Sequence, residues 1–271
     1  MLRKPLAFLK KDFLMEISYR FSFVLQFASI FFSVVMFYFV AKLLSDAPSV
    51  QKYLSEYGDG GYFAFVLIGI AFSSFLSVGL GSFSTNIRAE QMIGTMEAML
   101  VTPTRLPMIV ISSSIWSFAF TSLQVAVYLL IGGIFFGVNF GNANPWPALV
   151  ALLLTVIAFS SLGIISASFI MIFKRGDPIA WLISTSSTLL GGVYYPVNIL
   201  PDYLQTLSYF FPITYSLRAI RLSLLNGYGF SQVSSELLSL VLFSVIMLPI
   251  SLLVFRYAVG RAKRDGSLAY Y

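Results

Sequence analysis

The fold is decided by residues 87–107, which read IRAEQMIGTMEAMLVTPTRLP and separate two long apolar runs. The stretch carries charged side chains at Arg88, Glu90, Glu97 and Arg105. Its apolar residues recur at helical spacing beside these charges, at Ile93, Met96 and Leu100. Gly94 interrupts the middle, and Pro103 ends any helix because the residue before a proline is pushed out of the α region. We therefore expect a short helix over about 87–100, outside the hydrocarbon layer, with one apolar and one charged face.

The composition on either side of this stretch is that of an integral membrane protein. Of 271 residues, 58% are hydrophobic and only 10% are charged, and the mean hydropathy is +0.86. Each membrane-spanning helix needs about 20 apolar residues, so the chain has room for roughly six spans with short connections. The sequence therefore predicts an all-α membrane protein with a single domain over residues 1–271.

Six apolar runs are predicted to form the membrane helices, at 21–44, 62–85, 108–136, 148–173, 179–190 and 237–257. The fifth run is too short to cross the bilayer cleanly. Residues 1–20 alternate basic and apolar positions at helical spacing, which predicts an amphipathic helix in the inner interface. The alternative is a solvated basic tail that only sets the orientation. Because Asp12 and Glu16 interrupt this stretch, we expect it to belong to the mature protein and not to a cleaved signal peptide.

The distribution of charge predicts the orientation of the chain. The formal net charge is +6, but the basic residues lie at the edges of apolar runs and lack the aromatic interleaving of a nucleic-acid patch. We therefore expect no nucleic-acid partner. Of the 17 Lys and Arg residues, only Lys42, Lys52, Arg218 and Arg221 fall on the side opposite the termini. Both termini are expected in the cytoplasm, by the positive-inside rule.

Two of the predicted spans carry small polar residues. In the second span, small residues recur every four positions, at Gly69, Ser73, Ser77 and Gly81. The plainer explanation is close packing against another helix, and the alternative is a direct contact with a substrate. The fifth run holds a series of hydroxyls that includes Ser184, Ser187 and Thr188. These two sets are the candidate residues of a substrate path.

Residues 191–228 are apolar but cannot form one straight helix. Helix-breaking residues punctuate the stretch at Gly191, Gly192, Pro196, Pro201 and Pro212. We expect short helices that dip into the outer leaflet. Two arginines, Arg218 and Arg221, lie three positions apart in this stretch, where they either snorkel to the interface or meet an anionic head group.

The sequence lacks the residues that most catalytic chemistry requires. It contains no Cys and no His, which removes thiol and imidazole catalysis and the usual zinc and haem ligands. No glycine is followed by lysine, so the chain has no phosphate-binding loop of the nucleotide hydrolases. Asp177 has no second membrane-embedded carboxylate with which to share a proton. The chain is therefore predicted not to be an enzyme and to hold no cofactor or metal of its own.

Two separated segments resemble those of the ABC-2 type exporter permeases. Residues 88–103, RAEQMIGTMEAMLVTP, look like the coupling segment of that family. Residues 191–201, GGVYYPVNILP, followed by FPITY at 211–215 and by Arg218 and Arg221, are similar to its signature before the last span. The resemblance covers essentially the whole chain in length, span count and order. It implies six spans, an interfacial N-terminal helix, a cytoplasmic coupling helix between spans two and three, and outer re-entrant helices between spans five and six.

The resemblance also implies partners in the bilayer and below it. They are a second permease copy or paralogue and two cytoplasmic ATP-binding cassette subunits, which bind the ATP and Mg that this chain does not. The residues that couple to the ATPase would be Arg88, Glu90, Ile93, Gly94, Met96, Glu97 and Leu100. The outer re-entrant gate would comprise Gly191, Gly192, Tyr195, Pro196, Pro201, Arg218 and Arg221. The substrate path would run between the permeases along spans two and five.

The sequence therefore predicts the membrane-spanning subunit of an ATP-driven exporter that works by alternating access. Because no buried charge lines the expected path, an amphiphilic, lipid-linked or hydrophobic substrate fits better than a small charged solute. The alternative is a secondary transporter, or a membrane assembly factor, without an ATPase partner. Many secondary transporters are built from internal repeats, and the two halves of this sequence show no convincing similarity.

Overall fold

A computed structural model describes residues 10–264 of the chain, apart from positions 12, 15, 17, 45–51, 55, 58–60, 94–105 and 174–176. Within these ranges the regular structure is entirely helical. The long helices are α2 (Arg20–Leu44), α4 (Gly61–Ile93), α6 (Leu106–Phe136), α7 (Pro145–Phe173) and α11 (Ser234–Arg264). The shorter ones are α8 (Pro178–Leu190), η2 (Val197–Ile199), α9 (Asp202–Ser208) and α10 (Pro212–Leu225). The predicted all-α class is confirmed.

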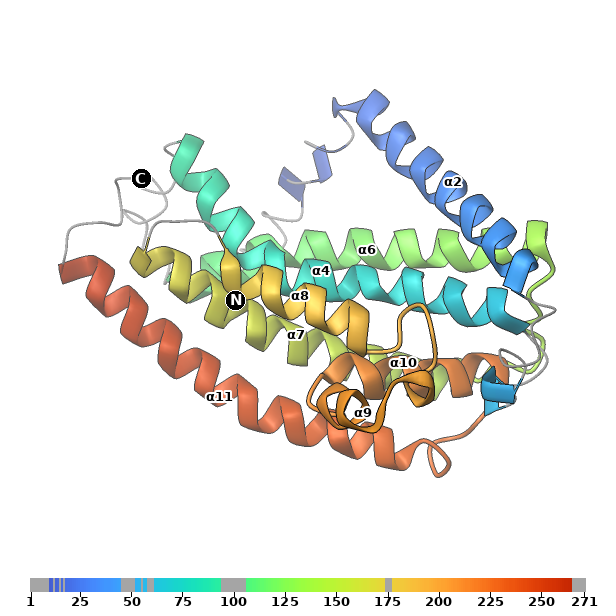
Figure 1. The fold of residues 1–271 in the computed structure, drawn as a ribbon. Helices are drawn as coiled ribbons and strands as arrows, with labels where there is room; N and C mark the ends of the chain where they lie inside the picture. The colour runs from blue at the N-terminus through green and yellow to red at the C-terminus, as the bar shows by residue number, and fades with distance from the viewer. Residues whose placement is uncertain are drawn as a thin grey trace.

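The long helices form an elongated bundle in which α4 and α7 are central (Figure 1). Helix α7 packs between α4 and α11, whereas α4 also packs against α6, and α2 crosses the bundle at an angle. Side chains of α4 supply the largest buried residues, among them Phe65, Ile68 and Phe75. The helix that carries the predicted small-residue face is therefore the centre of the core.

Five of the described helices are long and apolar enough to cross a membrane, instead of the six spans expected. Helix α8 has 13 residues, or about 20 Å at 1.5 Å per residue, whereas the hydrocarbon core is about 30 Å thick. Large apolar side chains are exposed along the outer faces of α2, α6, α7 and α11. Such exposure is expected where a helix faces lipid, because apolar side chains are stable there and backbone polar groups are satisfied within the helix.

Helix α4 is longer than predicted and continues past position 85 to Ile93 without a break. Its residues 86–93 contain neither glycine nor proline and include good helix formers, so nothing in the local sequence stops the helix at the edge of the apolar run. The separate helix expected to begin at residue 87 is in this part a continuation of α4. Residues 94–105, which complete that prediction, lie outside the described ranges.

The short helices gather at one end of the bundle, which we call the α10 end. Helices α4, α7 and α11 begin there, at Gly61, Pro145 and Ser234, and α6 finishes there. Helix α8 begins at the opposite end and runs alongside α4 toward the turn that leads to η2, α9 and α10 (Figure 1). The turn at the end of α8 is therefore brought against α10 and the first turns of α4.

Candidate functional site

The chain turns sharply at the end of α8, at the predicted Gly191–Gly192 break. The Gly191 N–H donates to the Ser187 carbonyl at 2.8 Å, which closes the last turn of the helix. Gly192 has a φ of 78°, a left-handed conformation that favours glycine over residues with a Cβ atom. Pro196 and Pro201 then stand directly before η2 and α9, where a missing N–H costs no helical hydrogen bond.

Arg221 of α10 binds this turn to α4, in a cluster that we call the arginine latch. Its Nη1 donates to the Gly192 carbonyl at 2.8 Å, and its Nη2 donates to the Val193 carbonyl at 3.0 Å. Its Nε donates to the Phe65 carbonyl of α4 at 3.1 Å, and the guanidinium lies 3.4 Å from the centroid of the Phe65 ring. Only 2% of Arg221 is exposed. The buried positive charge is thus compensated by carbonyl dipoles and an aromatic face.

The arginine latch requires glycine at position 69 of α4. A Cβ atom built there would lie 2.1 Å from the Val193 carbonyl oxygen and 2.5 Å from Arg221 Nη2. The Tyr62 hydroxyl, two turns earlier on α4, donates to the Tyr194 carbonyl at 3.0 Å and adds a second attachment. One end of α8 is therefore tied to α4 through backbone atoms of the turn.

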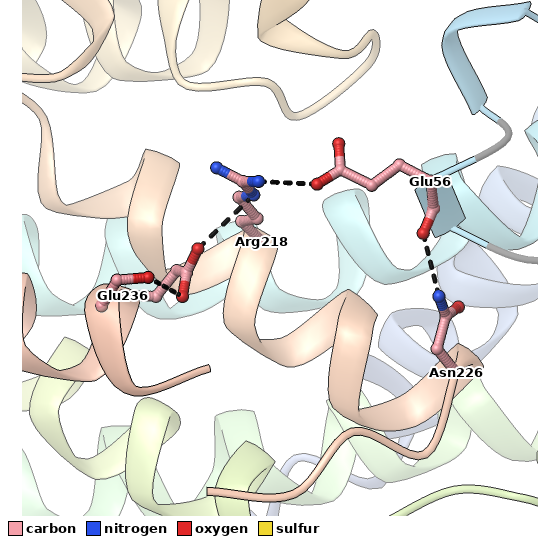
Figure 2. Close-up of polar contacts among 5 residues, drawn as sticks. Glu56, Arg218, Asn226 and Glu236 are labelled. Carbon is pink, nitrogen blue, oxygen red and sulfur yellow. Dashed lines mark hydrogen bonds and ion pairs between the residues drawn. The ribbon is translucent and has the colours of Figure 1, made fainter. Parts of the chain in front are cut away.

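Arg218, one turn before Arg221, makes a different kind of contact (Figure 2). Its Nη2 lies 2.6 Å from Glu56 Oε1, and its Nε lies 3.5 Å from Glu236 Oε1 in the first turn of α11. Asn226 Nδ2 donates to the Glu56 carbonyl at 2.9 Å. Desolvation lowers the pKa of Arg218, but the hydrogen bond and charge of Glu56 outweigh it, so the pKa is raised overall. This partly exposed pair joins α10, α11 and the segment before α4.

The burial of Arg221 corrects the expectation that it snorkels to the interface or meets a head group. Arg221 is enclosed and its donors are taken by carbonyl groups, so it does neither. The cavity between Arg218, Arg221 and the turn has a volume of only about 30 Å³, which is enough for about one water molecule. Arg221 therefore holds the turn, α10 and α4 together at this site, whereas Arg218 forms a partly exposed ion pair.

The other end of α8 is tied to α4 by Asp177, in a cluster that we call the aspartate latch. Asp177 Oδ1 accepts from the Ala180 N–H at 2.9 Å and so caps the first turn of α8. Ser84 Oγ of α4 donates to Asp177 Oδ2 at 3.1 Å, and Ser166 Oγ of α7 donates to Asp177 Oδ1. Three helices therefore meet at one carboxylate. 

Asp177 lies 15 residues before Gly192, at the opposite end of α8 from the arginine latch. Helix α8 is thus held to α4 at both of its ends.

The four residues of the predicted small-residue face of α4 lie in different environments. Gly69 belongs to the arginine latch, whereas Ser77 is exposed and a Cβ atom at Gly81 would meet no described atom within 4 Å. Ser73 Oγ donates back to the Ile70 carbonyl of its own helix at 2.8 Å. A close approach of α4 to α7 is made instead at Gly79, whose carbonyl oxygen would lie 2.0 Å from a Cβ atom at position 163.

The predicted hydroxyl residues of α8 also lie in different environments. Ser187 is fully buried, and its Oγ has no hydrogen-bond partner among the described residues. Thr188 Oγ1 donates to the Ser184 carbonyl at 2.8 Å, and both residues are partly exposed. Tyr195 turns back over the helix, and its hydroxyl donates to the Leu189 carbonyl. The exposed positions of α4 and α8 thus lie on neighbouring helices, and the structure assigns no ligand to them.

The predicted coupling residues are described only in part. Arg88 lies on α4 and is partly exposed, and Glu90 and Ile93 are backbone positions in the last two turns of that helix. The others, Gly94, Met96, Glu97 and Leu100, lie outside the described ranges, as does most of the segment 1–20. Their role in coupling stays a prediction.

Sequence reasoning missed the aspartate latch. Asp177 directly before Pro178 is a signal for the start of a helix, because an aspartate caps it and a proline suits its first position. No comparable signal marks Ser84 or Ser166, which are ordinary serines in apolar runs. Among the described residues, no group of three His, Cys, Asp or Glu side chains could hold a metal ion. The two latches connect helices and offer no constellation for bond chemistry.

Comparisons with known proteins match this architecture. The sequence profile described as "ABC-2 type transporter" matches residues 6–225. Nodulation protein J of Sinorhizobium fredii (strain NBRC 101917 / NGR234) is 28% identical over 190 residues, which cover 68% of this chain and 70% of that protein. Inner membrane transport permease YadH of Escherichia coli (strain K12) is 25% identical over 170 residues, which cover 62% and 63%. Because the profile spans most of the chain, this protein belongs to the ABC-2 type transporter family, whose members are membrane permeases.

Proposed function

We propose that the chain is the membrane-spanning subunit of an ATP-driven exporter. In this proposal two copies, or a copy and a paralogue, form the permease, and two cytoplasmic ATP-binding subunits supply the ATPase activity. The name of the relative YadH, inner membrane transport permease, supports a place in the inner membrane. The charge distribution supports cytoplasmic termini, which puts the α10 end outside.

The observation that carries the proposal is the continuity of α4. Its 33 residues extend over about 50 Å, from the arginine latch at the α10 end to the first predicted coupling residues at the other. Because a continuous helix is stiff along its axis, a push on residues 87–107 would reach the outer turn without being absorbed by a loop. The family's coupling segment would thus act on the outer gate through α4.

The two latches suggest which part of the permease moves. Helix α8 is attached to α4 by Asp177 at one end and by the carbonyl groups of Gly192 and Val193 at the other. We therefore expect α4 and α8 to move as one body during transport. A path along these helices would then open between the two permease copies and not between α4 and α8 of one copy.

The exposed surface of this body favours an amphiphilic substrate. Ser77 and Gly81 of α4 present a small polar surface, whereas Trp181, Leu182 and Leu189 of α8 are large, apolar and exposed. A solute with both a polar group and an apolar body would match this combination better than a small ion. The substrate class is therefore expected to be amphiphilic, lipid-linked or hydrophobic.

The proposal is tested by reversing charge on the coupling segment. The chain is purified with the ATPase that accompanies it and reconstituted, and ATP hydrolysis and export are measured for the double variant Glu90→Lys/Glu97→Lys. The two positions are seven apart, about two helical turns, so they share one face if the helix continues. We expect weaker association with the ATPase, or hydrolysis without export. Asp202→Lys, an exposed acid-to-base change at the α10 end, is the matched control and should behave as the wild type.

The proposal is wrong if no ATPase accompanies the wild-type chain. The assignment of the coupling surface is wrong if the double variant binds its ATPase and exports at the wild-type rate.

A further inference from the structure

A groove of about 330 Å³ opens where α4, α6, α7 and α10 meet, and none of the latch residues lines it. Helix α7 forms one wall from Pro145 to Leu152, and Phe72, Leu129 and Leu224 close the other sides. These lining side chains are apolar apart from the indole N–H of Trp146. A polar solute would find at most this one side-chain donor and no side-chain acceptor among them, so the groove suits hydrocarbon.

The length of the groove covers most of the hydrocarbon depth of one leaflet of a bilayer. The wall from Pro145 to Leu152 comprises eight residues, a rise of about 10 Å along the helix axis. The hydrocarbon of one leaflet is about 15 Å deep, half of a core of about 30 Å. The groove therefore runs along the bilayer normal for most of a leaflet, starting from the α10 end.

The surroundings of the groove place its opening at the edge of the membrane. Trp146 lies at the start of α7 and is 68% exposed, as expected for a tryptophan at the level of the lipid head groups. Leu149 on the groove wall is 46% exposed, and Leu153, one turn deeper and outside the groove, is 56% exposed. The groove is thus continuous with the apolar surface by which α7 faces lipid.

We propose that this groove binds one acyl chain of an outer-leaflet phospholipid, with the head group beside Trp146. A helix of a second copy is too thick for it, because packed helices have axes about 8–10 Å apart and fill far more space. The volume lies at the low end of ligand pockets, about 300–1,000 Å³, which suits a single chain better than a whole amphiphile. The bound lipid would fill the junction of four helices and so stabilise their packing.

The test measures lipid that stays with the purified protein. The chain is reconstituted with deuterated phosphatidylethanolamine, extracted into detergent, washed, and analysed by native mass spectrometry. We expect the wild type to retain the deuterated lipid and Ala148→Phe to lose most of it, because Ala148 lines the groove and a phenyl ring would occupy it. Leu153→Phe adds a ring of the same kind one turn away on the lipid-facing side and should retain the lipid.

A photo-crosslinking amino acid at position 149 gives a second measurement that leaves Ala148 in place. After washing, illumination should attach the deuterated acyl chain to position 149, and attach much less of it to position 153. Equal lipid retention by the Ala148→Phe and Leu153→Phe variants, or equal crosslinking at both positions, would overturn the proposal. Crosslinks to detergent alone, or to a second copy of the chain, would overturn it as well. None of these measurements requires the ATPase or a known orientation of the chain, and only the assignment to the outer leaflet rests on the proposed function.

Discussion

The arginine latch and the aspartate latch lie at opposite ends of α8 and satisfy their charges differently. Arg221 is enclosed and is compensated by three carbonyl groups and an aromatic ring, without a carboxylate among its described partners. Asp177 is partly exposed and accepts hydrogen bonds from two serines and one backbone N–H. A fully buried charge has no access to water when its partners are lost, whereas a partly exposed one does. The arginine latch is therefore expected to be the more sensitive of the two.

The largest effect is expected from Arg221→Lys, with Arg218→Lys as the matched control on the same helix. A lysine cannot donate to three diverging carbonyl groups and stack on Phe65 at once. Leaving buried carbonyls unpaired should lower the free energy of unfolding by about 2 to 3 kcal/mol. Arg218→Lys keeps a point charge beside Glu56 in a partly exposed site and should cost about 0.5 kcal/mol. Unfolding in detergent, followed by tryptophan fluorescence, measures both, and equal losses would contradict the distinction.

A smaller effect is expected from Asp177→Ala at the other end of α8. This change removes the cap of α8 and the acceptor of Ser84 and Ser166, which should cost about 1 to 2 kcal/mol. Asp177→Asn keeps an oxygen acceptor and should recover most of that loss. Asp202→Ala, an exposed acid in the first turn of α9, is the control and should change stability by about 0.5 kcal/mol or less. A loss at Asp177 larger than that of Arg221→Lys would reverse the order of the two latches.

The smallest effect is expected from linking α4 and α8 covalently at the position of the aspartate latch. Because the chain contains no cysteine, Ser84→Cys/Asp177→Cys provides a unique pair for a short thiol crosslinker. If α4 and α8 move as one body, the crosslinked permease should export at the rate of the same variant without crosslinker. The single-cysteine variants treated with the reagent control for modification of each thiol. Loss of export only in the crosslinked pair would mean that the two helices separate during transport.

Much of the fold followed from local sequence. Gly191 and Gly192 ended α8 as expected, and Pro196, Pro201 and Pro212 stand at the boundaries of short helices. The prediction failed where it relied on hydropathy to end a helix, because α4 runs on to Ile93 through residues that favour helix although they are polar. Hydropathy reports where lipid begins, whereas the end of a helix depends on residues that break it.

The candidate site was less predictable, because its contacts join residues far apart in the chain. The spacing predicts Gly69 as a member of a helix-packing face, but glycine is required there because Arg221 and the turn after α8 leave no space for a Cβ atom. The same pattern placed Ser77 and Gly81 in that face, although Ser77 is exposed and a Cβ atom at Gly81 would meet no described atom within 4 Å. A spacing of four residues identifies one side of a helix, but it does not identify what lies opposite.

The sequence by itself determined the class of this protein: a multi-pass membrane permease of the ABC-2 type, with helices placed by its apolar runs and turns placed by glycine and proline. Only the tertiary structure decided that Arg221 binds the carbonyl of Phe65, 156 residues away, and that Asp177 binds Ser84, 93 residues away. The reason is physical. Helix formation and membrane insertion depend on neighbouring residues and their transfer from water, whereas the partner of a buried charge depends on how complete helices pack against one another.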